Sequence, residues 1–309
     1  MVRESGAGKR DAERAADMDY QQQLKDIQKR IDKGDFAHGV AAESKMEPAP
    51  LVINPNYQGS GKLSGKTALI SGADSGIGRA VAVHYAKEGA NVAILYHEHD
   101  QDANETAEMC RKEGVDAVIV QFDQSQKDQC KTAVAEVKKA LGKIDILVCN
   151  SAFQRPAKSI MDIDEEQLDQ TMKVNVYGYF FLIQAALPEM SEGANIVCTT
   201  SVVSYHGQEM LIDYSATKGA ITALIRALSK SLIEKGIRIN GVAPGPVWTP
   251  FITNTFPKDA IKELGGGVPM GRISQPSEIA PSFVFLASED ATSFSGQVMH
   301  PNVMDYVGS

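Results

Sequence analysis

The sequence predicts a single α/β domain built on a doubly wound parallel sheet of about seven strands. From Lys66 onward, short apolar runs alternate with longer amphipathic stretches, the order that a parallel sheet with helices on both faces requires. The apolar runs predict strands at 67–71, 91–96, 117–121, 144–149, 194–200, 237–242 and 296–300. The amphipathic stretches predict helices at 79–88, 101–113, 127–141, 165–190, 213–235 and 276–287. Right-handed crossovers then place a ligand site at the carboxyl ends of the strands.

Residues 1–60 differ in composition from residues 61–309 and are predicted to form an N-terminal arm ahead of the catalytic domain. Apolar residues between Leu24 and Ile31 recur at helical spacing, and prolines punctuate the segment that follows. The arm contains too little apolar surface to fold alone. It is therefore either a disordered tail or a segment, Pro48–Tyr57 in particular, that wraps the body or a neighbouring subunit.

Composition excludes several classes of function. The formal net charge of −8 argues against nucleic acid or an anionic membrane as the main partner. No apolar run has the length of a membrane span, and no apolar stretch follows the first ten residues as a secretory signal requires. The four cysteines lack metal-type pairing, so a cytoplasmic location and no metal are expected; they are Cys110, Cys130, Cys149 and Cys198. Cys149 and Cys198 lie in apolar strand-like runs and are expected to be buried thiols.

A glycine-rich segment follows the first predicted strand and opens the first predicted helix. Gly72, Gly76 and Gly78 lie between Leu69-Ile70 and the amphipathic stretch from Ala80, which is the context of a dinucleotide site. Small residues let backbone N–H groups approach a pyrophosphate at the helix N-terminus. A glycine turn that only packs a helix on the sheet is the alternative. Asp74, Ser75 and Ile77 lie in the same turn and are included in the candidate cofactor site.

Tyr214 and Lys218 are spaced by four residues, which places both side chains on one face of a helix. An ammonium there lowers the pKa of the phenol and makes the tyrosine a proton donor or acceptor near neutral pH. The pair alone is weak evidence for a catalytic site, because the same spacing occurs by chance on many solvated helices.

These motifs together resemble those of the short-chain dehydrogenase/reductase family, with its single Rossmann-type domain. The resemblance covers roughly residues 62–300 and rests on Gly72-x-x-x-Gly76-x-Gly78, Asn150, Asn175, Ser201, Tyr214-x-x-x-Lys218 and Pro244-Gly245. The segments around Tyr214 and Pro244 resemble a branch with N-terminal extensions, named for aldehyde reductases and glucose or ribitol dehydrogenases. The resemblance implies an NAD(P)(H)-dependent enzyme, a small carbonyl or alcohol substrate and a homo-oligomer, which the resemblance suggests is a tetramer.

The resemblance also assigns roles to individual residues. It implies a catalytic set in which Ser201 holds the substrate oxygen, Tyr214 is the general acid or base, Lys218 supports Tyr214 and binds the nicotinamide ribose, and Asn175 supports a proton-relay water. Asp123 would contact the adenine, although a strand-end Asp that caps the next helix is an equal alternative. Asn150 and the segment containing Pro244, Gly245, Val247 and Thr249 would line the nicotinamide side.

Two stretches depart from the family pattern. Around Asn150, the chain has Cys149 where an asparagine is usual and Ala152 where a glycine is usual. Near the C-terminus, Val303-Met304 replaces a Gly-Gly pair. Bulkier residues there suggest an altered path of the tail.

The choice of cofactor depends on the end of the second predicted strand. An Asp at that position would bind the adenine ribose and favour NAD, but Tyr96 occupies it. No well-placed Arg or Lys signals NADP either, while His97 and His99 could supply partial positive charge and Glu98 and Asp74 oppose it. NADP(H) is weakly preferred and NAD(H) remains possible, and the two histidines can equally be solvated loop residues.

The substrate loop is expected at about 247–272. Apolar side chains predict a pocket for a hydrophobic carbonyl compound; they are Trp248, Phe251, Ile252, Phe256 and Val268, with Met210, Leu211 and Phe153 nearby. The alternative is that half of these side chains only pack the loop on the core. Polar Gln154, Gln208 and Glu209 keep a sugar or polyol dehydrogenase open as a second hypothesis. A cofactor-binding scaffold without turnover is the alternative of another class, and the intact Ser–Tyr–Lys set argues against it.

Overall fold

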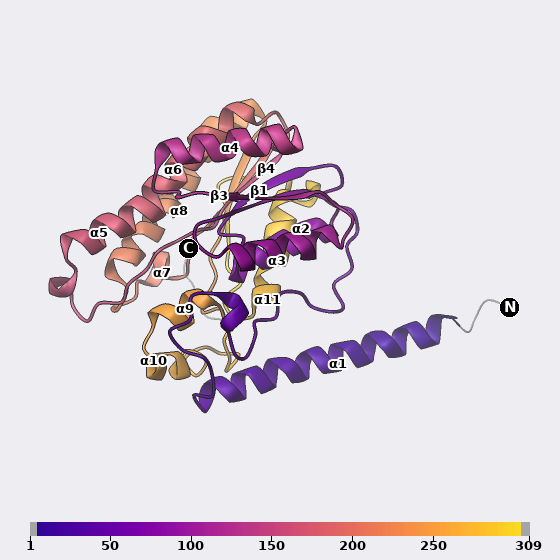
Figure 1. Cartoon of the computed structure of the whole chain (residues 1–309), viewed down its shortest axis with the longest axis vertical. Coiled ribbons are helices and arrows are strands. Elements are labelled where there is room, and N and C mark those ends of the chain that lie inside the picture. The colour runs from indigo at the N-terminus through magenta and orange to yellow at the C-terminus, as the bar shows by residue number, and fades with distance from the viewer. Residues whose placement is uncertain (1–4, 304–309) are drawn as a thin grey trace.

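The computed structural model describes residues 5–303, with side chains described from residue 15 onward. Seven parallel strands form one sheet in the order β3-β2-β1-β4-β5-β6-β7 (Figure 1). The strands are β1 (Thr67–Ser71), β2 (Asn91–Tyr96), β3 (Ala117–Gln121), β4 (Ile146–Cys149), β5 (Asn195–Thr199), β6 (Arg238–Val242) and β7 (Val298–Met299). The predicted fold class is confirmed, and three strand ranges match the prediction to the residue, at 67–71, 91–96 and 117–121.

Helices cover both faces of the sheet (Figure 1). The α-helices are α1 (Ser5–Asp32), α2 (Gly76–Lys87), α3 (Asp100–Arg111), α4 (Lys127–Leu141), α5 (Glu165–Met172), α6 (Gly178–Ala186), α7 (Val203–His206), α8 (Ile212–Leu232), α9 (Pro250–Thr255), α10 (Lys258–Glu263) and α11 (Pro276–Ala287). Short 3-10 turns occupy Glu43–Lys45, Ile160–Asp162, Leu187–Glu189, Ile233–Lys235 and Glu289–Ala291. None of the helices within the described chain is long and apolar enough to pass through a lipid bilayer.

The core lies in two layers because alternate strand residues point to opposite faces of the sheet. In β1, Ala68 and Ile70 pack with α2, α3 and α11, whereas Leu69 between them packs with α4, α6 and α8. All five β1 residues are buried, as expected for a central strand of a doubly wound sheet. Two buried layers of aliphatic side chains thus hold the strand ends in fixed positions.

The single helix predicted for residues 165–190 is divided. A π-helical turn, Lys173–Tyr177, separates α5 from α6, and α6 ends at Ala186 before a 3-10 turn that contains Pro188. The hydrophobic pattern continues through all of these segments, so periodicity alone does not show where the hydrogen-bond pattern changes.

The N-terminal arm is not a disordered tail within the described residues. Its long helix α1 leads into an extended segment that lies beside α9 and α10 (Figure 1). Ile27, Ile31 and Phe36 form a third apolar cluster with Trp248 and Phe256 of the substrate loop. The hypothesis that the arm wraps its own body is therefore confirmed, and the contact extends well upstream of Pro48–Tyr57.

Candidate active site

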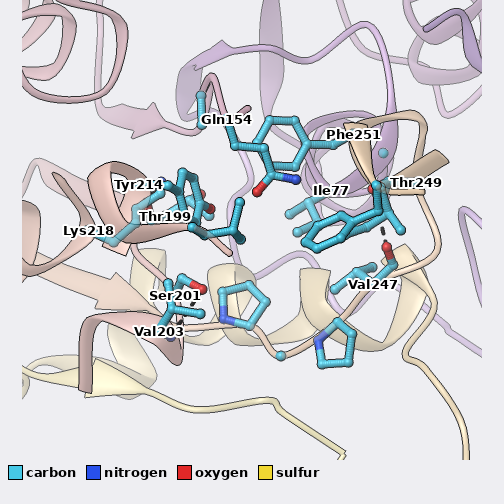
Figure 2. A pocket seen from close by; sticks show the side chains of 18 of the residues that line it. Ile77, Gln154, Thr199, Ser201, Val203, Tyr214, Lys218, Val247, Thr249 and Phe251 are labelled. Carbon is cyan, nitrogen blue, oxygen red and sulfur yellow. Dashed lines mark hydrogen bonds between the residues drawn. The ribbon is translucent and has the colours of Figure 1, made fainter. Parts of the chain in front are cut away.

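A cavity of about 660 Å³ opens at the carboxyl ends of the strands, where a doubly wound sheet places its ligand. Most of the predicted cofactor residues line it: Gly72, Asp74, Ser75, Gly76, Ile77, His97, Asn150, Tyr214, Lys218, Pro244, Gly245, Val247 and Thr249. Figure 2 shows Ser201, Tyr214 and Lys218 on one side of the cavity and Ile77, Val247 and Thr249 on the other. The segments that the sequence placed together thus meet in one cleft.

The glycine-rich turn is built for close approach of backbone. Gly72 has a φ of 63°, which glycine adopts without steric penalty. A Cβ atom on Gly78 would lie 1.9 Å from the carbonyl oxygen of Gly72, so only glycine lets the start of α2 pack against the end of β1. This cradle fits a dinucleotide, because Gly76 and Ile77 at the N-terminus of α2 line the cleft, and the partial positive charge of a helix N-terminus favours a pyrophosphate.

Asn150 holds the turn to the neighbouring strand. Its Nδ2 donates to the carbonyl oxygens of Ser71 and Gly72, both at 3.2 Å, and its Oδ1 accepts from Thr199 at 3.0 Å. One asparagine therefore connects the ends of β1, β4 and β5. Cys149, the departure beside it, is a buried thiol that packs in the core and does not line the cleft.

Ser201 and Tyr214 lie on the same side of the cleft, and both line it (Figure 2). Ser201 follows β5 in a half-buried loop, and Tyr214 lies in the first turn of α8 with 8% of its surface exposed. Burial raises the pKa of Tyr214 above its ordinary range, and a hydrogen bond from Ser201 opposes that shift. The phenol is therefore held as a neutral proton donor beside a second hydroxyl.

Lys218 lies one helical turn after Tyr214 and is fully buried. Its Nζ donates to the carbonyl oxygen of Thr199 at 2.7 Å and lies 5.5 Å from the ring centroid of Tyr214. Burial lowers the pKa of Lys218 to about 7, since the low-dielectric surroundings disfavour the ammonium.

The pKa shift that the sequence predicted for Tyr214 has the wrong direction. From the four-residue spacing we expected Lys218 to lower the pKa of the phenol, whereas burial raises it. Spacing along a helix gives proximity but not the desolvation of both groups, which here disfavours the phenolate and the ammonium alike.

Asn175 lies in the π-helical turn and is completely buried. Its Oδ1 accepts from the amide of Phe153 at 2.7 Å, and its Nδ2 donates to the carbonyl of Phe153 and to Thr217 Oγ1. The side chain ties the loop after β4 to α8 and does not line the cleft. Its position agrees with an asparagine that kinks its helix, while its predicted contact with a relay water stays a prediction.

Three predicted cofactor residues also lie outside the cleft lining. Gly78 is behind the turn, where it permits the packing described above. Tyr96 is buried and hydrogen-bonds to Asp100. The Oδ1 atom of Asp123 accepts from the Ser125 amide at 2.8 Å, a local turn contact, whereas the N-cap of α4 is Gln126, so Asp123 does not cap that helix. The predicted contact of Asp123 with the adenine stays a prediction.

The end of the cleft beside β2 has mixed charge. His97, Glu98 and His99 line it together with Asp74. His97 and Glu98 are exposed and lie 3.4 Å apart at Nδ1 and Oε1. No group of acidic, histidine and cysteine side chains suited to a metal occurs among residues that the structure describes.

The other end of the cleft is predominantly apolar. Phe251, Ile252, Phe256 and Val268 line it as predicted, as do Met210 and Leu211. Gln154, Gln208 and Glu209 add polar groups, and Gln154 donates to Thr255 Oγ1 at 2.7 Å. The predictions for Trp248 and Phe153 were wrong, because neither lines the cavity.

Trp248 packs against the arm instead. It is fully buried, its Nε1 donates to the Pro48 carbonyl at 2.8 Å, and its ring lies edge-on to Phe36. Apolar character marks a buried residue but does not distinguish a side chain that faces substrate from one that fixes the loop.

The C-terminal departure is accommodated by the backbone. Val303 has a φ of 53°, in the left-handed region that a β-branched residue rarely adopts. Its side chain is buried, and Asn302 packs over Gly245. A turn that glycine would form without strain is thus formed here by valine, and Met304 lies outside the described residues.

Two participants were missed by sequence reasoning. Thr199 provides the carbonyl that holds Lys218, a backbone role that no side-chain pattern reveals. Glu43 reaches the glycine-rich turn from the arm, where its amide hydrogen-bond partner Gly76 is more than thirty residues away (76 − 43 = 33). A single acidic residue in a charged segment gives no signal by which it could have been found.

Comparison with known proteins identifies the family. The family model described as enoyl-(acyl carrier protein) reductase matches residues 72–302. The chain belongs to the short-chain dehydrogenase/reductase family. It is an oxidoreductase of that family, whose members use a nicotinamide dinucleotide.

The relatives span both activities anticipated from the sequence. A glucose and ribitol dehydrogenase of Daucus carota is 49% identical over 267 residues, covering 84% of this chain and 91% of that protein. A chloroplastic NADPH-dependent aldehyde reductase of Arabidopsis thaliana is 47% identical over 267 residues, covering 84% and 93%. An angucycline C-6 ketoreductase with bound NADP superimposes with a TM-score of 0.75 at 29% identity, covering 80% of this chain and 98% of that one.

Proposed function

We propose that this protein reduces a hydrophobic carbonyl compound with a nicotinamide dinucleotide, and that Tyr214 donates the proton. The observation that carries the proposal is the convergence of Ser201 and Tyr214 on the cleft that begins at the glycine-rich turn. Burial keeps Tyr214 protonated at neutral pH, and this is the form that donates a proton in the reductive direction.

In this mechanism the bound dinucleotide supplies a hydride to the carbonyl carbon. Ser201 donates a hydrogen bond to the carbonyl oxygen and stabilises the negative charge that develops there. Tyr214 transfers its phenolic proton to the same oxygen, so that an alcohol forms and a tyrosinate remains. Lys218, with a pKa of about 7, stabilises the tyrosinate until a proton is returned from solvent.

The remaining site residues have supporting roles in the proposal. The turn from Gly72 to Gly78 binds the pyrophosphate, Lys218 also binds the nicotinamide ribose, and Asn150 with the Pro244–Thr249 segment surrounds the nicotinamide. Asn175 supports a relay water through its position in the π-helical turn. Residues 61–309 form the catalytic domain, and the arm supports it.

We propose NADP(H) as the preferred cofactor and NAD(H) as the weaker one. The NADPH-dependent relative and the ketoreductase with bound NADP support this choice. So does the lack of an Asp at the end of β2, where Tyr96 stands. His97 and His99 at the adenosine end offer partial positive charge to a 2′-phosphate, against Glu98.

An NAD-dependent sugar or polyol dehydrogenase is the second candidate. Gln154, Gln208 and Glu209 in the cleft favour it, since hydroxyl groups need polar partners, and one relative is named a glucose and ribitol dehydrogenase. The apolar wall of Phe251, Ile252 and neighbouring residues favours the carbonyl compound. A non-catalytic scaffold would have no chemical need for the Ser201, Tyr214 and Lys218 arrangement.

We further propose a cytoplasmic homotetramer. All four cysteines are buried free thiols, which suits a reducing compartment. Tyr177 and Phe180, at the start of α6, are 47% and 43% exposed, and an interface would bury them.

The proposal is tested by titrating the full chain with NADPH and NADH and following the fluorescence of the reduced nicotinamide. Turnover is then measured with a panel of aromatic and aliphatic aldehydes and ketones, and in reverse with glucose and ribitol. Tighter NADPH binding and turnover of apolar carbonyl compounds are expected. Saturable NAD-dependent oxidation of glucose or ribitol alone would favour the second candidate.

A further inference from the structure

The arm places a buried carboxylate against the back of the glycine-rich turn. Glu43 belongs to the 3-10 turn Glu43–Lys45 and is only 5% exposed. Its Oε2 accepts from the Gly76 amide at 2.5 Å, and its Oε1 lies 2.9 Å from Arg79 Nη1. Gly76 is the first residue of α2 and lines the cleft, whereas Glu43 does not. The carboxylate therefore contacts the glycine-rich turn without lining the cleft.

Arg79 extends this contact to the other end of the turn. Its Nε donates to the Asp74 carbonyl at 2.9 Å, and its Nη2 donates to the Asp102 carbonyl at 3.0 Å. The Asp102 carboxylate in turn accepts from the amides of Glu43 at 2.6 Å and Ser44 at 3.2 Å. The arm is thereby fastened to α3, and the Glu43 carboxylate reaches Gly76 directly and the Asp74 carbonyl through the Arg79 guanidinium.

The geometry requires two acceptors at residue 43. One carboxylate oxygen faces an N–H of Gly76 and the other faces an N–H of Arg79, so both partners are donors. A glutamine would present its amide NH₂ to one of the two, and a protonated carboxyl would present its O–H. Either change leaves a buried donor facing another donor, and the unpaired donor destabilises the geometry of the turn.

We propose that Glu43 is a positioning residue for the cofactor, holding the Asp74–Gly76 turn in its binding geometry. This inference rests on the proposed nicotinamide-dependent function. It assigns the arm, which precedes the region matched by the family model, a direct part in cofactor affinity. Glu43 does not contact the reacting atoms, so its loss weakens dinucleotide binding and leaves the chemical step intact.

Burial of the Glu43 carboxylate makes the effect depend on pH. The facing charged groups are Arg79 on α2, Asp102 and Glu105 on α3, and Asp74 in the turn. Burial raises the pKa of Glu43 to about 7, although Arg79 and the Gly76 amide oppose the shift. Below that pH the protonated form is populated, and the turn loses one of its two acceptor contacts.

The test compares NADPH dissociation constants of the wild type, Glu43→Gln, Glu43→Ala and the control Glu47→Gln between pH 6 and 8. Glu47 is an exposed carboxylate of the same arm whose partner is Arg30, so its variant controls for arm charge. At pH 8 we expect about tenfold weaker binding in Glu43→Gln, or about 1.4 kcal/mol, and no change in Glu47→Gln. The ratio of Glu43→Gln to wild type should shrink toward pH 6 as the wild type becomes protonated.

The single tryptophan separates positioning from loss of the arm. Trp248 is bonded to the arm at Pro48, so its emission reports arm docking. Weakened binding with unchanged emission supports the inference. Equal NADPH affinity of Glu43→Gln and wild type across the pH range overturns it, as does a red-shifted emission that accompanies the loss. If the wild type binds neither NADPH nor NADH, the proposed function itself is refuted. If the wild type binds, the comparison between variants tests only the role of Glu43.

Discussion

Trp248 joins the arm to the substrate loop, and replacing it with phenylalanine measures the strength of that junction. The indole N–H is the donor to the buried Pro48 carbonyl, and the ring contacts Phe36 at 5.5 Å between centroids. Trp248→Phe keeps an aromatic ring but removes the donor. An unpaired buried carbonyl costs about 1–3 kcal/mol. The space left by the smaller ring adds about 1 kcal/mol. We therefore expect arm docking to weaken by about 2–4 kcal/mol.

Limited proteolysis measures this directly, because cleavage tracks the population of the open form when opening is fast. Trypsin can cut after Lys33 and Lys45 once the arm detaches. A loss of about 2–4 kcal/mol corresponds to cleavage about 30- to 700-fold faster, since each 1.4 kcal/mol is tenfold. Urea unfolding of the same variant shows whether the body stays intact. Cleavage within twofold of the wild-type rate would refute the idea that this junction holds the arm.

Two further substitutions test the turn and the core. Gly78→Ala should weaken NADPH binding more than tenfold and destabilise the fold by about 3 kcal/mol, because the new Cβ atom would lie 1.9 Å from the Gly72 carbonyl oxygen. A titration that gives the wild-type NADPH affinity for this variant would contradict the expected clash. His84 has a pKa lowered to about 4 by burial, so the unfolded chain binds more protons between pH 6.5 and 4. The contribution of neutral, buried His84 to the free energy of unfolding is fully present above pH 6.5. As the pH falls from 6.5 to 4, the free energy of unfolding decreases by about 3 kcal/mol on account of this residue. Urea unfolding at pH 7 and 4.5 should therefore show a smaller loss of stability on acidification for His84→Gln than for the wild type. An equal loss in the two proteins would contradict the role given to His84.

Much of the fold follows from local patterns in the sequence. Buried parallel strands such as Thr67–Ser71 read as continuous apolar runs, and helix α4 has an amphipathic period that fixed its limits at 127–141. The turn from Gly72 to Gly78 could be predicted from the sequence because only glycine fits its positive φ at Gly72 and the close backbone contact at Gly78.

What could not be predicted depends on contacts between distant segments. Trp248 turned away from the cavity because Pro48 and Phe36, some two hundred residues upstream (248 − 48 = 200), offer it a partner. The pKa of Tyr214 rises because several elements together exclude water from it, which the spacing to Lys218 does not report. Glu43 gains its position only when the arm docks.

Turnover of Tyr214→Phe tests the central claim most directly. The variant removes one hydroxyl from a buried ring, so the fold and the glycine-rich turn should persist and NADPH should bind as tightly as to the wild type. With a carbonyl compound that the wild type reduces, we predict a fall in kcat of about 10² or more, the scale of a lost general acid. Near-wild-type kcat with intact NADPH binding would contradict proton donation by Tyr214.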